Sequence, residues 1–240
     1  MADELNEIEK IKEQNELRRR LIGTSAHSLR SALVNIKWTI EMILAGDMGS
    51  ISPEQEDYFK KLLENSAGAL NLVNDLLNIS HAEELQEKVE KQEIDLVLFV
   101  DKIINQFTGA AHNKKIKINF AREDMPKITT ESKKIEIILI NLLDNALRYT
   151  HEGTISINLK KETDFAQISV KDTGIGIPTP DQAKVFDKFF RSDNAKKKEQ
   201  MGTGLGLYIS KLLIEGMGGK IWFESQENKG STFYFTLPIK

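Results

Sequence analysis

Three polar side chains share one face of a helix whose other residues are mostly apolar. Asn141, Asn145 and Arg148 are spaced four and three residues apart within a helical pattern that covers residues 131–149. An amide oxygen on such a face can bind Mg²⁺, and a guanidinium can reach a phosphate group. An ordinary amphipathic helix with its polar side in water explains the same spacing, so the triplet indicates a site only in combination with other segments.

A carboxylate followed by two glycines stands at the end of an expected strand. Asp172 follows the strand pattern of residues 166–171, and Gly174 and Gly176 come after it at alternate positions. The carboxylate would accept a hydrogen bond from an exocyclic amine, and the glycines would let a flat base come close to the backbone. A turn that binds nothing is the alternative interpretation of this segment.

A second set of alternating glycines leads into a helical pattern over residues 205–217. Gly202, Gly204 and Gly206 would leave free N–H groups and the helix dipole facing an anion such as phosphate. The cluster lacks the Lys-Ser/Thr ending of a Walker motif and is weak evidence by itself. The charged segment 192–201, which precedes it, has no apolar periodicity, and we expect it to form a mobile lid over the site.

Residues 1–88 predict a pair of long helices. Apolar or small residues recur at alternating spacings of four and three over residues 22–43 and again over residues 59–80, which is a heptad pattern. Turn-forming residues separate the two patterns, and Ser52 with Pro53 is typical of an N-cap and a first helical position. A single hairpin cannot bury the apolar stripes of both helices completely, so we expect two copies to form a four-helix bundle.

The remainder of the chain alternates between strand and helix patterns. Strands are expected at residues 116–120, 154–160, 166–171, 220–224 and 232–237, and helices at residues 96–106, 131–149 and 205–217. Such an order predicts a mixed sheet with helices on one face, an α/β sandwich. We therefore divide the chain into residues 1–20, 21–88 and 89–240, and we expect a hinge at the charged connector 83–93.

The composition narrows the class of protein. The 240 residues are 40% hydrophobic and 29% charged, with a net charge of -3 and no cysteine. This charge gives no indication of nucleic-acid binding, and the lack of cysteine excludes disulfides and thiolate chemistry. No apolar run reaches the roughly 18 residues of a membrane span, and the first residues lack the features of a signal peptide. We expect a soluble cytoplasmic fragment without membrane contact, preceded by any membrane sensor that the natural protein has.

The order of these motifs resembles that of the sensor histidine kinases of two-component systems. The N, G1, F and G2 boxes of that family are similar to four motifs of this chain: Asn141-x-x-x-Asn145, Asp172-x-Gly174-x-Gly176, Phe186-x-x-x-Phe190 and Gly202-x-Gly204-x-Gly206. The stretch from His27 to Leu33 stands where the family carries its H box. The resemblance covers nearly the whole chain and implies an α+β protein of two domains, a helical hairpin that forms a dimeric four-helix bundle and an α/β sandwich of the Bergerat, or GHKL, type.

The resemblance implies a kinase that acts on itself. The chain would bind Mg-ATP, phosphorylate His27 and pass the phosphoryl group to an aspartate on a response-regulator receiver domain, with phosphatase activity also implied. Residues 1–20 would be a signal-input coiled coil, and residues 21–88 the dimerisation and histidine-phosphotransfer hairpin of a homodimer. Residues 89–240 would be the catalytic ATP-binding domain.

The resemblance also assigns roles to individual residues. Asp172 would bind the adenine amino group, Asn145 the Mg²⁺, and Asn141 and Arg148 the phosphate region. The other nucleotide contacts would come from Tyr149, Gly174, Gly176, Ile177, Phe190, Arg191, Gly202, Thr203, Gly204, Leu205, Gly206, Leu207 and Thr232. His27 would be the phosphoacceptor, and the catalytic set around it would comprise Ser28, Arg30 and Ser31 together with Asn141.

The residues around His27 are compatible with this role. His27 follows Ala26, a member of the heptad pattern, so its ring is expected at the edge of the bundle, exposed to another domain. An imidazole with an ordinary pKa near ~6.5 is largely neutral at pH 7 and can attack phosphorus. Without the second domain, the same pattern would indicate an ordinary surface histidine.

Two residues of the H box differ from the family pattern. Ser28 stands where a carboxylate or an amide usually orients the imidazole, and a hydroxyl cannot act as a carboxylate base. Ala32 replaces a proline that would kink the helix. We therefore expect slower autophosphorylation than is typical of the family and a straighter first helix. Ser31 occupies a position where the family often carries a hydroxyl or an amide that serves dephosphorylation of the regulator.

Two other functions would use part of the same pattern. An ATPase of the gyrase, mismatch-repair and heat-shock chaperone superfamily shares the nucleotide motifs, but it does not need a heptad hairpin that carries His27. A non-catalytic dimeric scaffold that binds nucleotide or a regulator would explain Ser28 and Ala32. Labelled ATP separates the three functions, because they leave acid-labile label on the protein, released phosphate only, or neither.

Overall fold

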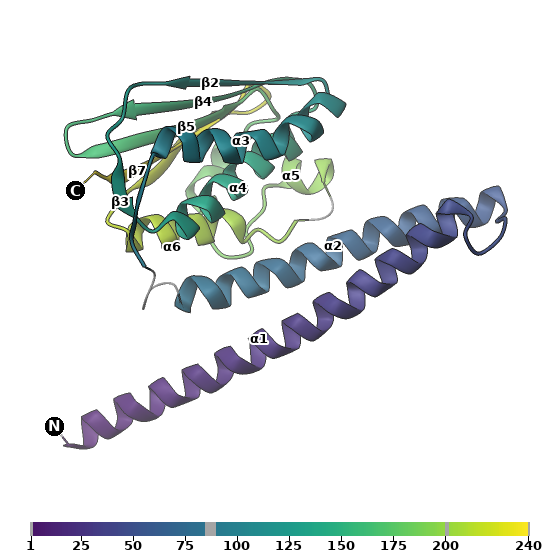
Figure 1. Cartoon of the computed structure of the whole chain (residues 1–240), viewed down its shortest axis with the longest axis horizontal. Helices are drawn as coiled ribbons and strands as arrows, with labels where there is room; N and C mark the ends of the chain where they lie inside the picture. Colours follow the sequence, from purple (N-terminus) through teal and green to yellow (C-terminus); the bar gives the residue numbers. More distant parts are fainter. Residues whose placement is uncertain (1, 85–89, 200–201, 240) are drawn as a thin grey trace. The chain divides into compact units, whose positions relative to one another are not determined.

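The chain forms two compact units, Met1–Glu83 and Glu84–Lys240, coloured from purple to blue and from teal to yellow in Figure 1. The computed structural model describes residues 2–84, 90–199 and 202–239, apart from the side chains of residues 2–22, 27, 71 and 74–84. None of the described helices combines the length and the apolar character that crossing a membrane requires.

The first unit is a hairpin of the two long helices α1 (Ala2–Ala45) and α2 (Pro53–Glu84). The predicted start of the second helix is confirmed: Ser52 Oγ accepts a hydrogen bond from Gln55 N at 3.2 Å, and Gln55 Oε1 accepts one from Ser52 N at 2.8 Å. This reciprocal pair is a capping box, which satisfies two N–H groups at the helix start. Helix α1 continues without a break through Ala32, as expected where no proline interrupts the helix.

The heptad seam of the hairpin is only partly buried. Ala26, Ile40 and Val73 are less than 9% exposed, and Ala26 packs with Val73 of the other helix, whereas Leu29 and Ile36 remain about half exposed at 52% and 50%. The exposed members alternate with the buried ones along α1, so a second apolar stripe is left uncovered in a single chain. This is the surface that the expected four-helix bundle would bury.

The second unit is a five-stranded mixed sheet with its helices on one face (Figure 1). In spatial order the strands are β2 (Ile116–Arg122), β4 (Gly153–Lys161), β5 (Phe165–Asp172), β7 (Gly230–Pro238) and β6 (Ile221–Gln226). Only β2 and β4 run parallel, and the other neighbours are antiparallel. The covering helices are α3 (Leu96–Asn113), α4 (Ser132–Tyr149) and α6 (Gly206–Gly216). The predicted α/β sandwich is confirmed.

The core of this unit lies between the sheet and the helices. Alternate residues of β4, such as Ile155 and Ile157, are 1% exposed, and on the helix side of the core residues of α4 such as Ile138 and Leu139 are fully buried. Their neighbours in the strand point to the open face, which produces the period-2 pattern of the sequence. The buried stripe of α4 leaves only its opposite face, with Asn141 and its neighbours, free for a site.

The structure also contains elements that the sequence patterns did not predict. Strand β1 (Gln92–Ile94) pairs with β3 (Ile128–Thr130) in a separate two-stranded sheet. The helical turn η1 (Thr179–Lys184) and the short helix α5 (Asp193–Lys198) lie between β5 and α6. Elements of three to six residues are too short to produce a recognisable period. The expected hinge includes residues 85–89, which lie outside the described residues.

Candidate active site

Asn141 connects α4 to the beginning of α6. Its Nδ2 donates to the carbonyl oxygen of Gly206 at 3.1 Å and lies 3.4 Å from Ser210 Oγ. The hydroxyl of Ser210 in turn donates to the same Gly206 oxygen at 2.9 Å. The amide nitrogen of Asn141 therefore holds the second glycine segment against α4, and only its amide oxygen is left for a ligand in the predicted phosphate region.

Asn145 has a different environment one helical turn later. It is half-buried, and within the described part of the chain its side-chain amide makes no hydrogen bond. Both atoms of the amide are therefore free to bind a ligand, which fits the metal-binding role implied for this residue. Mg²⁺ commonly uses one or two protein ligands and completes its shell with phosphate oxygens and water.

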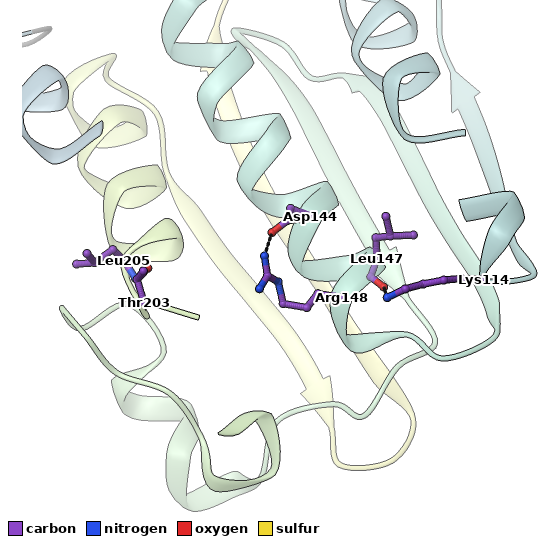
Figure 2. A network of polar contacts seen from close by, with 6 residues as sticks. All are labelled: Lys114, Asp144, Leu147, Arg148, Thr203 and Leu205. Atoms are coloured by element: carbon purple, nitrogen blue, oxygen red, sulfur yellow. Dashed lines mark hydrogen bonds and ion pairs between the residues drawn. The ribbon is translucent and has the colours of Figure 1, made fainter. Parts of the chain in front are cut away.

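Arg148 forms an ion pair with Asp144 on the same face of α4, as Figure 2 shows. Arg148 Nη2 lies 2.8 Å from Asp144 Oδ2. Burial alone would lower the pKa of Arg148, but the charge and the hydrogen bond of Asp144, with Tyr149 and Glu199 contributing, raise it above its ordinary value. The guanidinium is therefore a permanent cation, and Asp144 holds it beside the predicted phosphate region.

The last turn of α4 is supported from outside the site by Lys114. The Lys114 Nζ donates to the carbonyl oxygen of Leu147 at 3.1 Å, from the side of α4 that lies opposite the Arg148 side chain in Figure 2. The final carbonyl groups of a helix lack partners within the helix, and a cation near them is also favoured by the helix dipole. Lys114 thus stabilises the turn that carries Arg148 and Tyr149.

Asp172 ends β5 as a buried carboxylate that is 6% exposed. Its Oδ1 accepts hydrogen bonds from Gly174 N at 2.8 Å and from Ser231 N at 3.3 Å. Burial raises the pKa of Asp172 to about 6, although these two hydrogen bonds act in the opposite direction. Its Oδ2 makes no hydrogen bond to a described residue and is open to a donor on a ligand.

The glycines that follow Asp172 are required by the protein's own backbone. A Cβ on Gly174 would collide with the carbonyl group of Tyr149, and a Cβ on Gly176 would collide with that of Gln226. Gly176 also has φ +62°, a conformation that side chains rarely adopt. We call residues 172–176 the base loop. Its shape is set by these contacts and by a hydrogen bond from Ile175 N to Tyr149 O at 3.3 Å.

The second glycine segment packs on the aromatic residues that precede the lid. Gly204 has φ +71°, and its carbonyl oxygen accepts a hydrogen bond from Phe189 N at 3.1 Å. Leu205 is 4% exposed, so only its backbone is available to a ligand. Helix α6 begins at Gly206 without a side-chain cap, which leaves N–H groups of its first turn for an anion.

Arg191 holds the segment between these elements. Its guanidinium donates to the carbonyl oxygens of Gly202 at 3.0 Å and Ala195 at 3.2 Å, and also to that of Glu199. We call residues 192–199 the lid. The expected lid thus contains the short helix α5, and residues 200 and 201 lie outside the described residues. The guanidinium of Arg191 is bonded to these backbone carbonyls. The contact with nucleotide expected of Arg191 remains a prediction.

One member of the expected nucleotide set lies on the open face of the sheet. Thr232 pairs with Lys171 across β5 and β7, so both point to the open face of the sheet, away from Asp172. The neighbouring residue, Ser231, is 7% exposed and donates its backbone N–H to the carboxylate. Successive residues of a strand point to opposite faces, so Ser231 lies beside Asp172, and a nucleotide contact of Thr232 stays a prediction.

The expected catalytic residues of the H box all lie on α1, in the other unit. The side chain of His27 lies outside the described residues. Ser28 Oγ donates to Thr24 O, four residues earlier, at 3.1 Å. This hydroxyl is therefore bonded to its own helix, and Ser28 offers neither a carboxylate nor a free donor next to His27. Arg30 and Ser31 each take part in further polar contacts.

Several residues that shape the site were missed in the sequence. Asp144 and Ser210 bond to Arg148 and Asn141, and Asn194 bonds to the base loop. The spacing of Asp144 and Arg148 is a recognisable ion-pair signal, but the others depend on contacts between distant segments. Phe189, whose backbone bonds to Gly204, is 69% exposed with φ +63°. In the sequence it could be noticed through its position next to Phe190.

No cluster of three or more His, Cys, Asp or Glu side chains in the described part of the chain is arranged to hold a metal ion. The groups that fit Mg-ATP are instead the free amide of Asn145, the open Oδ2 of Asp172 and the N-terminus of α6. A metal that arrives with a triphosphate needs few protein ligands, so this set is chemically sufficient.

Two known domain families match the chain, one in each unit. The His Kinase A (phospho-acceptor) domain matches residues 17–85. The histidine kinase-, DNA gyrase B-, and HSP90-like ATPase domain matches residues 130–240, which include all four nucleotide motifs.

Curated relatives share this domain order. Sensor histidine kinase WalK of Bacillus subtilis (strain 168) is 37% identical over 231 residues, which are 93% of this chain and 37% of that protein. Sensor protein kinase WalK of Staphylococcus aureus is 31% identical over 232 residues, which are 93% of this chain and 54% of that protein. The chain thus spans between 37% and 54% of the length of these two relatives.

Solved structures agree with this relationship. Full-length ShkA in complex with AMPPNP has a TM-score of 0.71 at 24% identity, over 91% of this chain and 45% of that chain, and it bears on the fold alone. The nucleotide-free catalytic domain of the histidine kinase ThkA has a TM-score of 0.56 at 30% identity, over 63% of this chain and 97% of that domain. Since both units match, each with its expected fold, the chain belongs to the sensor histidine kinase family.

Proposed function

We propose that this chain is the cytoplasmic core of a homodimeric sensor histidine kinase, which uses Mg-ATP to phosphorylate His27 and then phosphorylates an aspartate of a response-regulator receiver domain. One observation carries the proposal. Asp172 Oδ2 and the amide of Asn145 have no partner among the described residues, although the groups around them are bonded to the protein. Unused polar groups of this kind at a buried site are available for a ligand.

The nucleotide would be held from three directions. The Oδ2 of Asp172 accepts the adenine amino group, the first N–H groups of α6 donate to phosphate, and Arg148 contributes a fixed positive charge. Asn145 would hold Mg²⁺ through its amide oxygen, and the metal when bound neutralises charge on the β- and γ-phosphates. The match of residues 130–240 to the histidine kinase-, DNA gyrase B-, and HSP90-like ATPase domain supports a nucleotide in this domain.

The proposed reaction needs position and charge neutralisation more than covalent help from the protein. A nitrogen of the His27 imidazole forms a bond to the γ-phosphorus while the bond from this phosphorus to the β–γ bridging oxygen breaks. ADP leaves with the electron pair, and the imidazole proton passes to water. In the second step a carboxylate oxygen of the receiver domain bonds to the phosphorus and the P–N bond breaks. The electron pair of that bond returns to the ring nitrogen, which takes a proton from water, and neutral His27 is restored.

The dimer and the domain roles follow from the hairpin. Leu29 and Ile36 on α1 and Leu62 on α2 are each at least 50% exposed, and a second copy would cover them in a four-helix bundle. Residues 1–20 would bring the signal into this bundle, and the connector at 83–93 would let the ATP-binding domain move towards His27.

The receiver domain would dock on a different face of α1. His27, Ser31, Val34 and Trp38 are spaced four, three and four residues apart, so these positions share one side of the helix. Val34 is 37% exposed and Trp38 is 67% exposed, and neither belongs to the heptad seam. An exposed tryptophan on the helix face of the phosphoacceptor suits a protein partner, and Ser31 on this face would serve dephosphorylation of the regulator.

Labelled ATP tests the proposal directly. The purified chain incubated with Mg-ATP labelled at the γ-phosphate should acquire acid-labile, base-stable label, and the variant His27→Gln should acquire none. Released phosphate without protein label would favour an ATPase of the gyrase, mismatch-repair and heat-shock chaperone superfamily, and neither label nor hydrolysis would favour the non-catalytic scaffold. Because Ser28 cannot act as a base, the label should appear slowly, over minutes rather than seconds.

A further inference from the structure

One side-chain amide attaches the lid to the base loop. Asn194 Nδ2 donates to the carbonyl oxygen of Gly176 at 3.0 Å, and Ser192 Oγ donates to Asn194 Oδ1 at 2.6 Å. The two bonds require the same orientation of the amide, because a carbonyl oxygen accepts only from the NH₂ group. The amide is therefore held from both ends, and Ser192, which fixes it, is 8% exposed.

The other end of the lid is attached to the second glycine segment. Arg191 donates to the carbonyl oxygens of Ala195 and Gly202, as described above, and Ala195 is 8% exposed. The lid therefore has one anchor on the loop that begins with Asp172 and another on the segment that precedes α6. Asn194 supplies the side-chain bond of the first anchor.

The Gly176 carbonyl is part of the base loop, where the glycine lies close to the backbone of Gln226 and has a left-handed conformation. A ligand that engages Asp172 stabilises this loop and hence the acceptor to which Asn194 is bonded. We propose that Asn194 is a positioning residue that couples occupancy of the base loop to the position of the lid. The coupling to nucleotide rests on the proposed function, whereas the anchor itself does not. Coupling between two sites acts equally in both directions. Loss of the Asn194 bond should therefore weaken nucleotide binding.

The basic run of the lid provides a way to measure its attachment. Lys196, Lys197 and Lys198 are exposed, and trypsin cleaves after lysine in segments that open locally. In the nucleotide-free chain, Asn194→Ala should speed cleavage at these lysines about three- to tenfold, the range expected for loss of one hydrogen bond. Asn105→Ala is the matched control, because it removes an exposed amide whose one partner among the described residues is Asp101 on α3.

The second measurement is the affinity for Mg-ADP by calorimetry. Asn194→Ala should bind about three- to tenfold more weakly than the unmodified chain, and at saturating Mg-ADP its lid should still be cleaved faster. Asn105→Ala should match the unmodified chain in both measurements. Ser192→Ala, which leaves the amide in place but removes its orienting bond, should give smaller changes of the same sign, and it replaces Asn194→Ala if that variant does not fold.

Three results would overturn the inference. Unchanged cleavage of free Asn194→Ala would mean that the bond does not hold the lid. Faster cleavage with unchanged affinity for Mg-ADP would mean that the lid is anchored but not coupled, as a purely structural role predicts. If the unmodified chain binds no Mg-ADP, the proposed function and the coupling both fail, and cleavage of the free chain still decides whether Asn194 is an anchor.

Discussion

Replacement of Asp172 by asparagine should stabilise the free protein while it abolishes nucleotide binding. Asparagine keeps a carbonyl oxygen that can accept from Gly174 N and Ser231 N, so the hydrogen bonds of the base loop are preserved. What is lost is a buried negative charge, which burial disfavours. The variant therefore separates the energetic cost of this carboxylate from its role as an acceptor for the adenine amino group.

The magnitude follows from the pKa of Asp172. The ordinary pKa of 3.8 is raised to about 6 in the folded protein, mainly by burial. This gap corresponds to about 3 kcal/mol of unfolding free energy. Between pH 4 and pH 6 the folded state holds more protons than the unfolded state at this group, so its contribution to stability is fully present below pH 4 and is lost as pH rises through 6. Asp172→Asn should thus be up to about 3 kcal/mol more stable at pH 7.5, with little difference at pH 4.

Urea unfolding at several pH values measures this difference. The chain has two tryptophans, Trp38 on α1 and Trp222 on β6, so a Trp38→Phe background makes Trp222 fluorescence report the second unit alone. Other groups titrate equally in both proteins and cancel in the comparison. The reasoning is refuted if Asp172→Asn is less stable at pH 7.5, or if the difference in unfolding free energy is the same at pH 4.5 and pH 7.5.

Four further predictions concern nucleotide binding and phosphoryl transfer. Asn145→Ala should weaken Mg-ATP binding by on the order of 10- to 100-fold while the small metal-free affinity stays the same, measured by calorimetry with and without EDTA. Lys114→Met should weaken Mg-ATP binding about threefold by loosening the end of α4, whereas the neighbouring Lys115→Met should not. Ser28→Glu should raise the autophosphorylation rate about tenfold or more, and an unchanged rate would argue against a missing base. Trp38→Ala should slow phosphotransfer to the cognate receiver domain at least about fivefold with autophosphorylation unchanged, and equal loss of both would indicate a damaged hairpin instead.

Most of the architecture could be predicted because long elements repeat their burial pattern many times. Helix α4 repeats its buried positions over several turns, and strand β4 repeats them at every second residue. The start of α2 could be predicted from Ser52 and Pro53, because a capping box needs only residues close in sequence. Strand β1 could not be predicted, since three residues carry no period and its partner β3 is more than thirty residues away.

The site was predictable in its residue types but not in its contacts. Asn141 was expected near phosphate, yet its amide nitrogen bonds to Gly206, which is 65 residues away in the sequence. Ser231 was not expected near Asp172, because the face of a strand residue depends on register with the neighbouring strand. The polar residues of a site can thus be recognised by their spacing in the sequence. Only the folded structure shows which of them bond to the protein and which are left to bind a ligand.

The base loop shows why that division matters for function. Its glycines were expected to make room for a base, but the groups that would meet their side chains are carbonyls of Tyr149 and Gln226. The loop therefore has its shape without a nucleotide, and within it Asp172 Oδ1 is bonded while Oδ2 is left open. A buried carboxylate with one free oxygen costs stability in the empty protein, and a donor on the ligand offsets that cost on binding. The shape of the base loop keeps the Asp172 carboxylate buried, where its charge is unfavourable. A base with an amino group is therefore preferred, because it donates a hydrogen bond to this carboxylate.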